Sequence, residues 1–423
     1  KLGFRATLYC MLGVLAALVA KAIGPSISAD FSSNIGADAV DAILAIIASS
    51  MLAVTTFSLT TMVAATSAAS SSATPRASKL LIEDSTAQRA LSTFLGAFLF
   101  SLVGLIALKT NFYGPGGRLV LFLATLSVIV IIVVTLLRWI AHLSRLGRLS
   151  ETIERVEAAA AMAMQEYRDN PAMGGKLFDK PPADALPICH NHIGYIEHLE
   201  MDELQAATAE HQVNIFMMMR PGGFCVPGRP VAYIQPAGEN KPDMDALSEA
   251  ICNALSVEDS RSFEGDPRFG LIVLCEIGSR ALSAAINDSG TIIDVLNKLM
   301  RVLSLAAPSD TGSDEKSPAI EYPNVYLRPI GMADFFEDAF MPLARDGAGL
   351  LEGGIKLQKT CAALGSLHPV FREPAINLSR SAQERAMKAL TYEGDRQRLS
   401  DEALAARQML EESVSRHHAT MQV

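Results

Sequence analysis

Four long apolar runs lie in the first 143 residues, and no further run follows. They cover Phe4 to Ile23, the stretch after Gly36 to about Ala69, Leu91 to Leu108, and Leu119 to Ile140. Each run approaches the roughly 18–20 residues that a helix needs to cross about 30 Å of hydrocarbon. Only helices satisfy the backbone of such segments in lipid. We therefore predict a four-helix transmembrane domain over residues 1–143.

The first run has an alternative interpretation. Lys1 and Arg5 precede it and Ala20-Lys21-Ala22 closes it, a pattern that also suits a secretory signal. The apolar stretch is long for a signal, so we favour a spanning helix.

Basic residues flank the runs unequally. One side would hold Lys1, Arg5, Arg76, Lys79, Arg89, Arg138, Arg145 and Arg148, and the other only Lys21, Lys109 and Arg118. Cytoplasmic flanks carry the excess of Lys and Arg, so both termini and the C-terminal domain are expected in the cytoplasm. Trp139 would then lie at the inner rim of the bilayer, and Phe112 and Tyr113 at the outer rim.

The second run is longer than a perpendicular span requires, and from Asp38 to Ser72 it must tilt or project from the bilayer. At about 100° per residue, one acidic and four hydroxyl side chains fall within about 20° of one line. They are Asp38, Ser49, Thr56, Thr60 and Ser67. Such a line suits close helix packing, which hydroxyls on other faces also favour. It also suits the lining of a pore with Asp38 as a charge ring at the outer mouth, although packing is the simpler interpretation.

Charge and composition exclude several function classes. No Lys, Arg, Asp or Glu lies at the centre of any run, which argues against a proton pump or ion-coupled carrier. The net charge is −9 and no basic stripe interleaved with aromatics occurs, so nucleic-acid binding is not expected. The six cysteines are scattered without a C-x-x-C motif, as is typical of reduced thiols.

The rest of the chain predicts an α+β cytoplasmic domain, mostly helical with a small β unit. We expect a juxtamembrane stalk helix and linker at 144–187, a β-rich unit at 188–240, and a mainly helical domain at 241–423. The stalk should continue the fourth run, and the linker should cover Asp169 to Pro187, where prolines and a Gly-Gly pair occur.

Alternation and capping residues predict individual elements of this domain. Strands are expected at Ile193–Leu199, Val213–Met219, Pro230–Ile234 and Asn324–Arg328, and helices at Met201–His211, Asp266–Ala284, Thr291–Leu305, Met332–Leu343, Gly349–Leu364, Ala375–Leu390 and Ser400–Ser415.

Candidate chemistry is sparse. Cys189-His190-Asn191-His192 with His198 is the densest group of possible ligands, yet its spacing matches no standard zinc site. No phosphate loop, dinucleotide fingerprint or nucleophile elbow occurs, so we expect no metal, no cofactor and no enzyme. Asp266, Asn287 and Asp288 could meet at helix N-termini and hold a ligand, although helix capping is the simpler interpretation.

Several motifs together resemble a known bacterial family, DUF2254, whose members are predicted membrane proteins. They are Gly36-Ala37-Asp38-Ala39, Pro75-Arg76 with Leu80 to Asp84, Gly194-Tyr195-Ile196, Pro221-Gly222, Asp266-Pro267-Arg268-Phe269-Gly270, Arg280-Ala281-Leu282-Ser283, and Ile286-Asn287-Asp288 with Thr291. The chain departs from the family pattern at Ala284-Ala285 and Ser289, where Pro-Gly and Pro are usual. The resemblance implies four membrane helices and a cytoplasmic C-terminal domain, and it brings no established activity. We expect the protein to lie in the bacterial inner membrane.

Two functions remain open. The first is a homo-oligomer in the lipid bilayer with a channel-like path for ions or small solutes, lined by the second helix and regulated by the cytoplasmic domain. The alternative is a non-conducting scaffold or accessory subunit that docks a protein partner through that domain.

Overall fold

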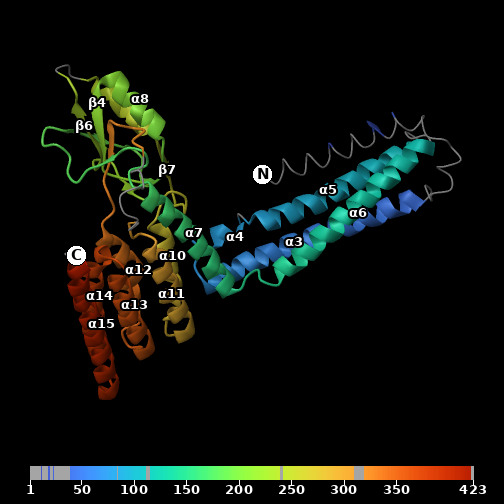
Figure 1. Cartoon of the computed structure of the whole chain (residues 1–423). Coiled ribbons are helices and arrows are strands. Elements are labelled where there is room, and N and C mark those ends of the chain that lie inside the picture. The colour runs from blue at the N-terminus through green and yellow to red at the C-terminus, as the bar shows by residue number, and fades with distance from the viewer. Residues whose placement is uncertain are drawn as a thin grey trace. The chain divides into compact units, whose positions relative to one another are not determined.

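A computed structural model of the chain describes residues 39–82, 84–110, 115–238, 242–308 and 319–420, together with positions 11, 18, 19 and 22. Apart from those single positions, the first predicted span, Phe4 to Ile23, lies outside the described residues, as do Asp38, Phe112 and Tyr113. The chain divides into two compact units, Lys1–Thr152 and Ile153–Val423 (Figure 1).

The first unit contains three helical segments that are long and apolar enough to cross a membrane, at Val40–Ser72, Ser78–Lys109 and Gly117–Leu143. They comprise α3 (Val40–Ser72), the short α4 (Ser78–Ile82), α5 (Ser85–Lys109) and α6 (Pro115–Leu143). Three of the four predicted spans thus appear as candidate membrane helices in the described part of the chain.

Small residues on α5 allow its neighbours to pack closely. α5 contacts both α3 and α6, and its buried face carries Ala87, Ala90, Gly96, Ala97, Ser101 and Gly104. A Cβ at Gly104 would lie 3.1 Å from Leu44 of α3. Membrane helices use small residues in this way because lipid provides no hydrophobic force between them, so van der Waals contact has to hold them together.

The stalk is separated from the last membrane helix. α6 ends at Leu143 and α7 (Leu149–Asp169) begins after a turn in which Gly147 has a φ of +83°. The prediction of one uninterrupted helix is therefore wrong, because Gly147 adopts a left-handed backbone conformation that ends a right-handed helix.

Two β-sheets follow α7. Five strands have the order β1-β8-β4-β6-β2 and three have the order β5-β3-β7. The strands are β1 (Lys176–Leu177), β2 (Leu186–Cys189), β3 (Gly194–Leu199), β4 (Val213–Met217), β5 (Phe224–Cys225), β6 (Pro230–Pro236), β7 (Leu255–Glu258) and β8 (Val325–Leu327). β4 is central and almost wholly apolar, and α8 (Met201–His211) packs against β4 and β8. The core of this part includes Ile215 and Val325, both fully buried.

The segment Asp169 to Pro187, predicted as a linker, instead contains strand β1 and the start of strand β2. β1 pairs in parallel with β8, and β2 pairs antiparallel with β6 at the opposite edge of the sheet. Pro187 lies within β2, where an edge position tolerates the missing N–H. This segment belongs to the sheet, and its strands are too short for their alternation to be visible in the sequence.

The remaining helices form the C-terminal part of this unit, where α12, α13, α14 and α15 pack together (Figure 1). They are α10 (Phe269–Ala281), α11 (Ser289–Ser304), α12 (Met332–Asp346), α13 (Leu351–Leu367), the 3-10 turn η3 (Pro369–Phe371), α14 (Arg372–Ala389) and α15 (Glu393–Thr420). α9 (Met244–Asn253) packs instead against α8 and β7 beside the sheets. The order of the predicted helices is confirmed, and α15 begins earlier than expected.

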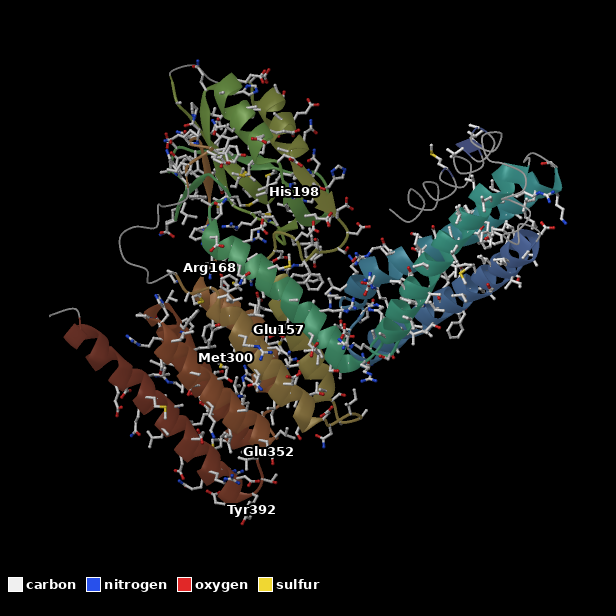
Figure 2. All side chains as sticks on the ribbon, turned by 45° about the vertical axis from the view of Figure 1, so that its right-hand side comes forward. Glu157, Arg168, His198, Met300, Glu352 and Tyr392 are labelled. Carbon is white, nitrogen blue, oxygen red and sulfur yellow. The ribbon has the colours of Figure 1, made fainter. Side chains whose placement is uncertain are left out.

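Ion pairs join α7 to α11. The carboxylate of Glu157 lies 2.7 Å from Nζ of Lys298 and 2.6 Å from Nε of Arg301. Figure 2 shows Glu157 on α7 beside α11, on which Met300 is labelled. Because Glu157 and Lys298 are mostly buried, this pair is screened less by salt than a surface pair would be.

Candidate functional site

The hydroxyl line of α3 faces outward from the described helices. Ser49, Thr56, Thr60 and Ser67 are all exposed, whereas Asp38 lies outside the described residues. The first three each donate a hydrogen bond of 3.0 Å to the backbone carbonyl four residues earlier. Each hydroxyl therefore has its donor satisfied within its own helix and presents its oxygen lone pairs outward.

The buried face of α3 lies on the other side of the helix. It consists of Val40, Leu44, Ile47, Met51, Ser58, Ala65 and Ala69. Ser49 and Ser58 are nine residues apart, which places them about 180° apart around the helix axis at about 100° per residue. The hydroxyl line is thus opposite the face that packs within the subunit, and no described residue covers it.

A buried polar chain links the three helices at one end of the first unit. Nε1 of Trp139 donates to Oγ of Ser58 at 2.9 Å, and the Trp139 ring stacks on His142 with centroids 5.6 Å apart. Nε2 of His142 lies 3.1 Å from Oδ2 of Asp84 without the alignment of a hydrogen bond. Asp84 also caps α5 by accepting two backbone N–H bonds. This polar chain is not predicted from the sequence, although Trp139 and His142 at i and i+3 on one helix face are a local signal for it.

The other end of the same unit carries a surface ion pair. Nζ of Lys109, at the end of α5, lies 2.6 Å from Oδ2 of Asp41, at the start of α3. Both side chains are substantially exposed, so the pair contributes little to stability on its own.

Asp266 is a buried structural anchor. Its carboxylate accepts two hydrogen bonds from Arg261, at 2.7 and 3.0 Å, and two more from the backbone N–H groups of Arg268 and Phe269. Burial raises the pKa of Asp266, and Arg261 acts against that shift. Gly222, with a φ of +87°, lies so close that a Cβ there would be 2.1 Å from Oδ2 of Asp266. The motif therefore fastens the turn after β4 to the start of α10.

The residues that follow Asp266 extend this anchor to two more helices. Arg268 pairs with Asp338 of α12 through two hydrogen bonds, and Gly270 lies against Ala160 of α7. Asp266, Arg261 and Arg268 thus all bond to partners within the protein, which supports a structural role.

Asp288 and Asn287 lie at the far end of α10 from Asp266. Asp288 caps α11 by accepting hydrogen bonds from N and Oγ1 of Thr291, at 3.0 and 2.7 Å, and these bonds lower its pKa. Asn287 has a φ of +48° and closes a tight turn despite the departure at Ala284-Ala285. Since α10 has 13 residues, a helix length of about 20 Å separates the two ends. The structure does not bring the three candidates together.

Among the residues that the structure describes, the thiols and histidines form no metal centre. No group of three or more His, Cys, Asp or Glu side chains in the described ranges is placed to hold a metal ion. Burial raises the pKa of Cys225 and Cys252, and it raises the pKa of Cys275 and of Cys361 to about 12. These four thiols are therefore protonated near neutral pH and are poor nucleophiles.

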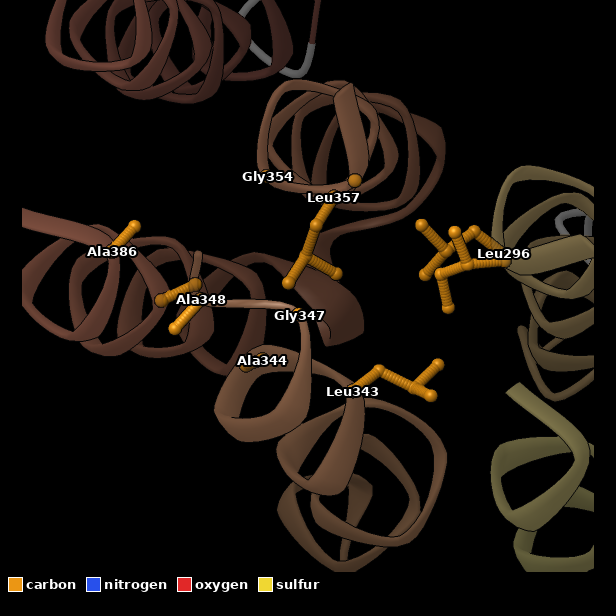
Figure 3. A pocket seen from close by; sticks show the side chains of 11 residues that line it. Leu296, Leu343, Ala344, Gly347, Ala348, Gly354, Leu357 and Ala386 are labelled. Carbon is orange, nitrogen blue, oxygen red and sulfur yellow. The ribbon is translucent and has the colours of Figure 1, made fainter. Parts of the chain in front are cut away.

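A small cavity lies among the C-terminal helices (Figure 3). Its side chains are hydrocarbon only and include Leu296, Leu343 and Leu357, with Gly354 and Ala386 beside them. Its volume of about 20 Å³ leaves room for about one water molecule. We interpret it as a packing gap between helices rather than as a ligand site.

Comparison with known proteins identifies the family of the chain and assigns it no activity. The family described as "Predicted membrane protein (DUF2254)" matches residues 1–363. Uncharacterized proteins of Mycobacterium bovis and Mycobacterium tuberculosis are each 29% identical to the chain over 140 residues. That segment is 32% of this chain and only 27% of each relative. No solved structure gives a significant match. Because the family match covers most of its length, the chain belongs to the DUF2254 family of predicted membrane proteins.

Proposed function

We propose that the chain forms a homo-oligomer in the bacterial inner membrane, in which copies of α3 surround a narrow path for ions or small solutes. The C-terminal domain, on the cytoplasmic side with both termini, regulates that path. One observation carries the proposal: Thr56 and Thr60 face outward, opposite the side of α3 that packs on its own subunit. A hydroxyl line in that position is available to an axis shared by several copies.

The chemistry of the line favours cations and water over anions. The hydroxyl hydrogens of Ser49, Thr56 and Thr60 are bound to backbone carbonyls of the same helix. The groups left facing a path are therefore oxygen lone pairs, which accept hydrogen bonds and coordinate cations. Exposed Leu52 and Leu59 flank the line and suit contact with a neighbouring copy or with lipid.

Liposome flux tests the proposal. Purified full-length chain is reconstituted, and release of potassium, chloride and glycerol is followed separately. Thr56→Leu combined with Thr60→Leu should abolish most of the flux, since two bulky apolar side chains per copy would close and dry a narrow path.

Thr61→Leu is the matched control. Thr61 makes the same bond as Thr60, to the carbonyl four residues earlier at 2.9 Å, but points about 100° away around the helix. It should leave the flux unchanged. Equal flux in the double variant and the control would contradict the lining by α3. A complete absence of flux for all three solutes would contradict conduction and favour the scaffold that docks a protein partner.

A further inference from the structure

A cavity of about 270 Å³ opens among segments of the second unit that are far apart in sequence. α7 supplies Glu166 and Tyr167, the loop after β4 supplies Arg220, and the segment before β8 supplies Glu321 and Tyr322. The volume is near the lower end of the roughly 300–1,000 Å³ that is usual for small-molecule sites. The cavity therefore has the size for a small metabolite.

Arg220 is a partly buried cation for which the described residues supply no carboxylate partner. Its guanidinium carbon lies 5.0 Å from the centre of the Tyr167 ring, and Nη1 donates to the backbone oxygen of Arg328 at 3.1 Å. Among the described residues no carboxylate forms a salt bridge with it. Burial lowers the pKa of Arg220, yet a guanidinium remains charged. Four of its five N–H donors are left for other partners, and a bound carboxylate would offset the cost of burying the charge.

The aromatic walls of the cavity are fixed before any ligand arrives. The hydroxyl of Tyr167 accepts a hydrogen bond of 2.9 Å from a backbone N–H just before α12, and that of Tyr322 donates to Asp202 at 3.0 Å. The carbonyl of Gly174 accepts from the backbone N–H groups of both Glu321 and Tyr322, at 2.8 and 2.9 Å. Preorganised walls of this kind lower the entropic cost of binding.

The charges of the lining select the ligand class. Glu166 and Glu321 are exposed carboxylates at the rim of the same cavity, and Arg220 is its only basic side chain among the described residues. A simple anion would be repelled by the carboxylates, and a simple cation by Arg220. We propose that this cavity binds a small zwitterion of the free amino acid class, with its carboxylate on Arg220 and its ammonium group toward Glu166 and Glu321. This inference does not depend on the path through the membrane.

Calorimetric titration of the full-length chain in detergent tests the proposal. The probes are the twenty free amino acids, with acetate, inorganic phosphate and ethylammonium as ligands that carry only one kind of charge. At least one amino acid should bind, and Arg220→Gln should weaken it by about ten- to a hundredfold, as expected for hydrogen bonds to a charged group. Glu166→Gln and Glu321→Gln should each weaken it by a smaller factor.

Arg328→Gln is the control, because the backbone oxygen that Arg220 contacts is kept and the Arg328 side chain does not line the cavity. It should bind like the unmodified chain. Three results would overturn the proposal: no amino acid binding up to about 10 mM, acetate or phosphate binding as tightly as the best amino acid, or unchanged affinity in Arg220→Gln. If Arg220→Gln fails to fold, the two glutamate variants decide, since both side chains are exposed.

Discussion

Gly270 is the second residue of α10 and allows α7 to lie directly against that helix. A Cβ added there would be 2.3 Å from Cβ and 2.7 Å from Cα of Ala160. The nearer atom belongs to a side chain of one carbon, and the other is helix backbone, so neither can swing away. Gly270→Ala must therefore push α7 and α10 apart.

Gly270→Ala should destabilise the protein, whereas helix propensity alone would predict that it stabilises. Alanine in place of glycine inside a helix usually stabilises by about 0.5–1 kcal/mol. Overpacking a tight contact costs about 1–3 kcal/mol, so the net result should be a loss of between about 0 and 2.5 kcal/mol, centred on about 1.3 kcal/mol. Gly353, the third residue of α13, is the control, because a Cβ there would meet only Leu350 at 3.6 Å or more. Gly353→Ala should stabilise.

Hydrogen exchange of the full-length chain, read by mass spectrometry, measures both effects locally. Exchange in α7 and α10 should become roughly tenfold faster in Gly270→Ala, since about 1.4 kcal/mol corresponds to a factor of ten. Exchange in α13 should become slower in Gly353→Ala. Slower exchange in α10 of Gly270→Ala would refute the close approach of the two helices.

Three further predictions concern buried contacts. Asp266→Ala should lower the free energy of unfolding by about 3–5 kcal/mol, because Arg261 is left buried without its carboxylate; loss of exchange protection in α10 would measure it. Trp139→Phe should lower the free energy of unfolding by about 0.5–1.5 kcal/mol, because it removes the hydrogen bond to Ser58. Thermal unfolding in detergent should show little further loss of stability when Trp139→Phe is added to Ser58→Ala. Burial alone would raise the pKa of Glu157, but hydrogen bonds from Arg301 and Lys298 of α11 bring this pKa below its ordinary value of 4.5. The stabilisation is therefore complete above pH 4.5 and is lost as the pH falls through the lowered pKa; Glu157→Gln should remove this part of the acid sensitivity of α7 exchange.

Elements with strong local signals were predictable from the sequence. α8 spans Met201–His211 as expected, and β3 and β4 agree with their predicted strands to within two residues. The capping roles of Asp266 before α10 and Asp288 before α11 were also predictable, because each residue precedes an apolar periodic segment. Alternation, periodicity and capping residues act over a few positions, so one sequence is enough to detect them.

Contacts between distant segments were not predictable. Ser58 and Trp139 are 81 residues apart, and only the packing of α3 against α6 joins them. Arg220 contacts Tyr167 because the loop after β4 lies close to α7 in the fold, and no sequence motif at either residue indicates a cavity. The order of the five-stranded sheet depends on β8, which comes almost ninety residues after β6 in the chain. Such pairings are set by tertiary structure, which local patterns do not encode.

Water access to α3 in the intact membrane tests the central claim most directly. Thr56→Cys and Thr61→Cys are compared in membrane vesicles with a charged, water-soluble thiol reagent, using the unmodified chain as background. If copies of α3 enclose a path, the reagent should modify the cysteine at position 56 and spare the one at position 61, which lies about 140° away around the helix. Protection of both positions would contradict the account.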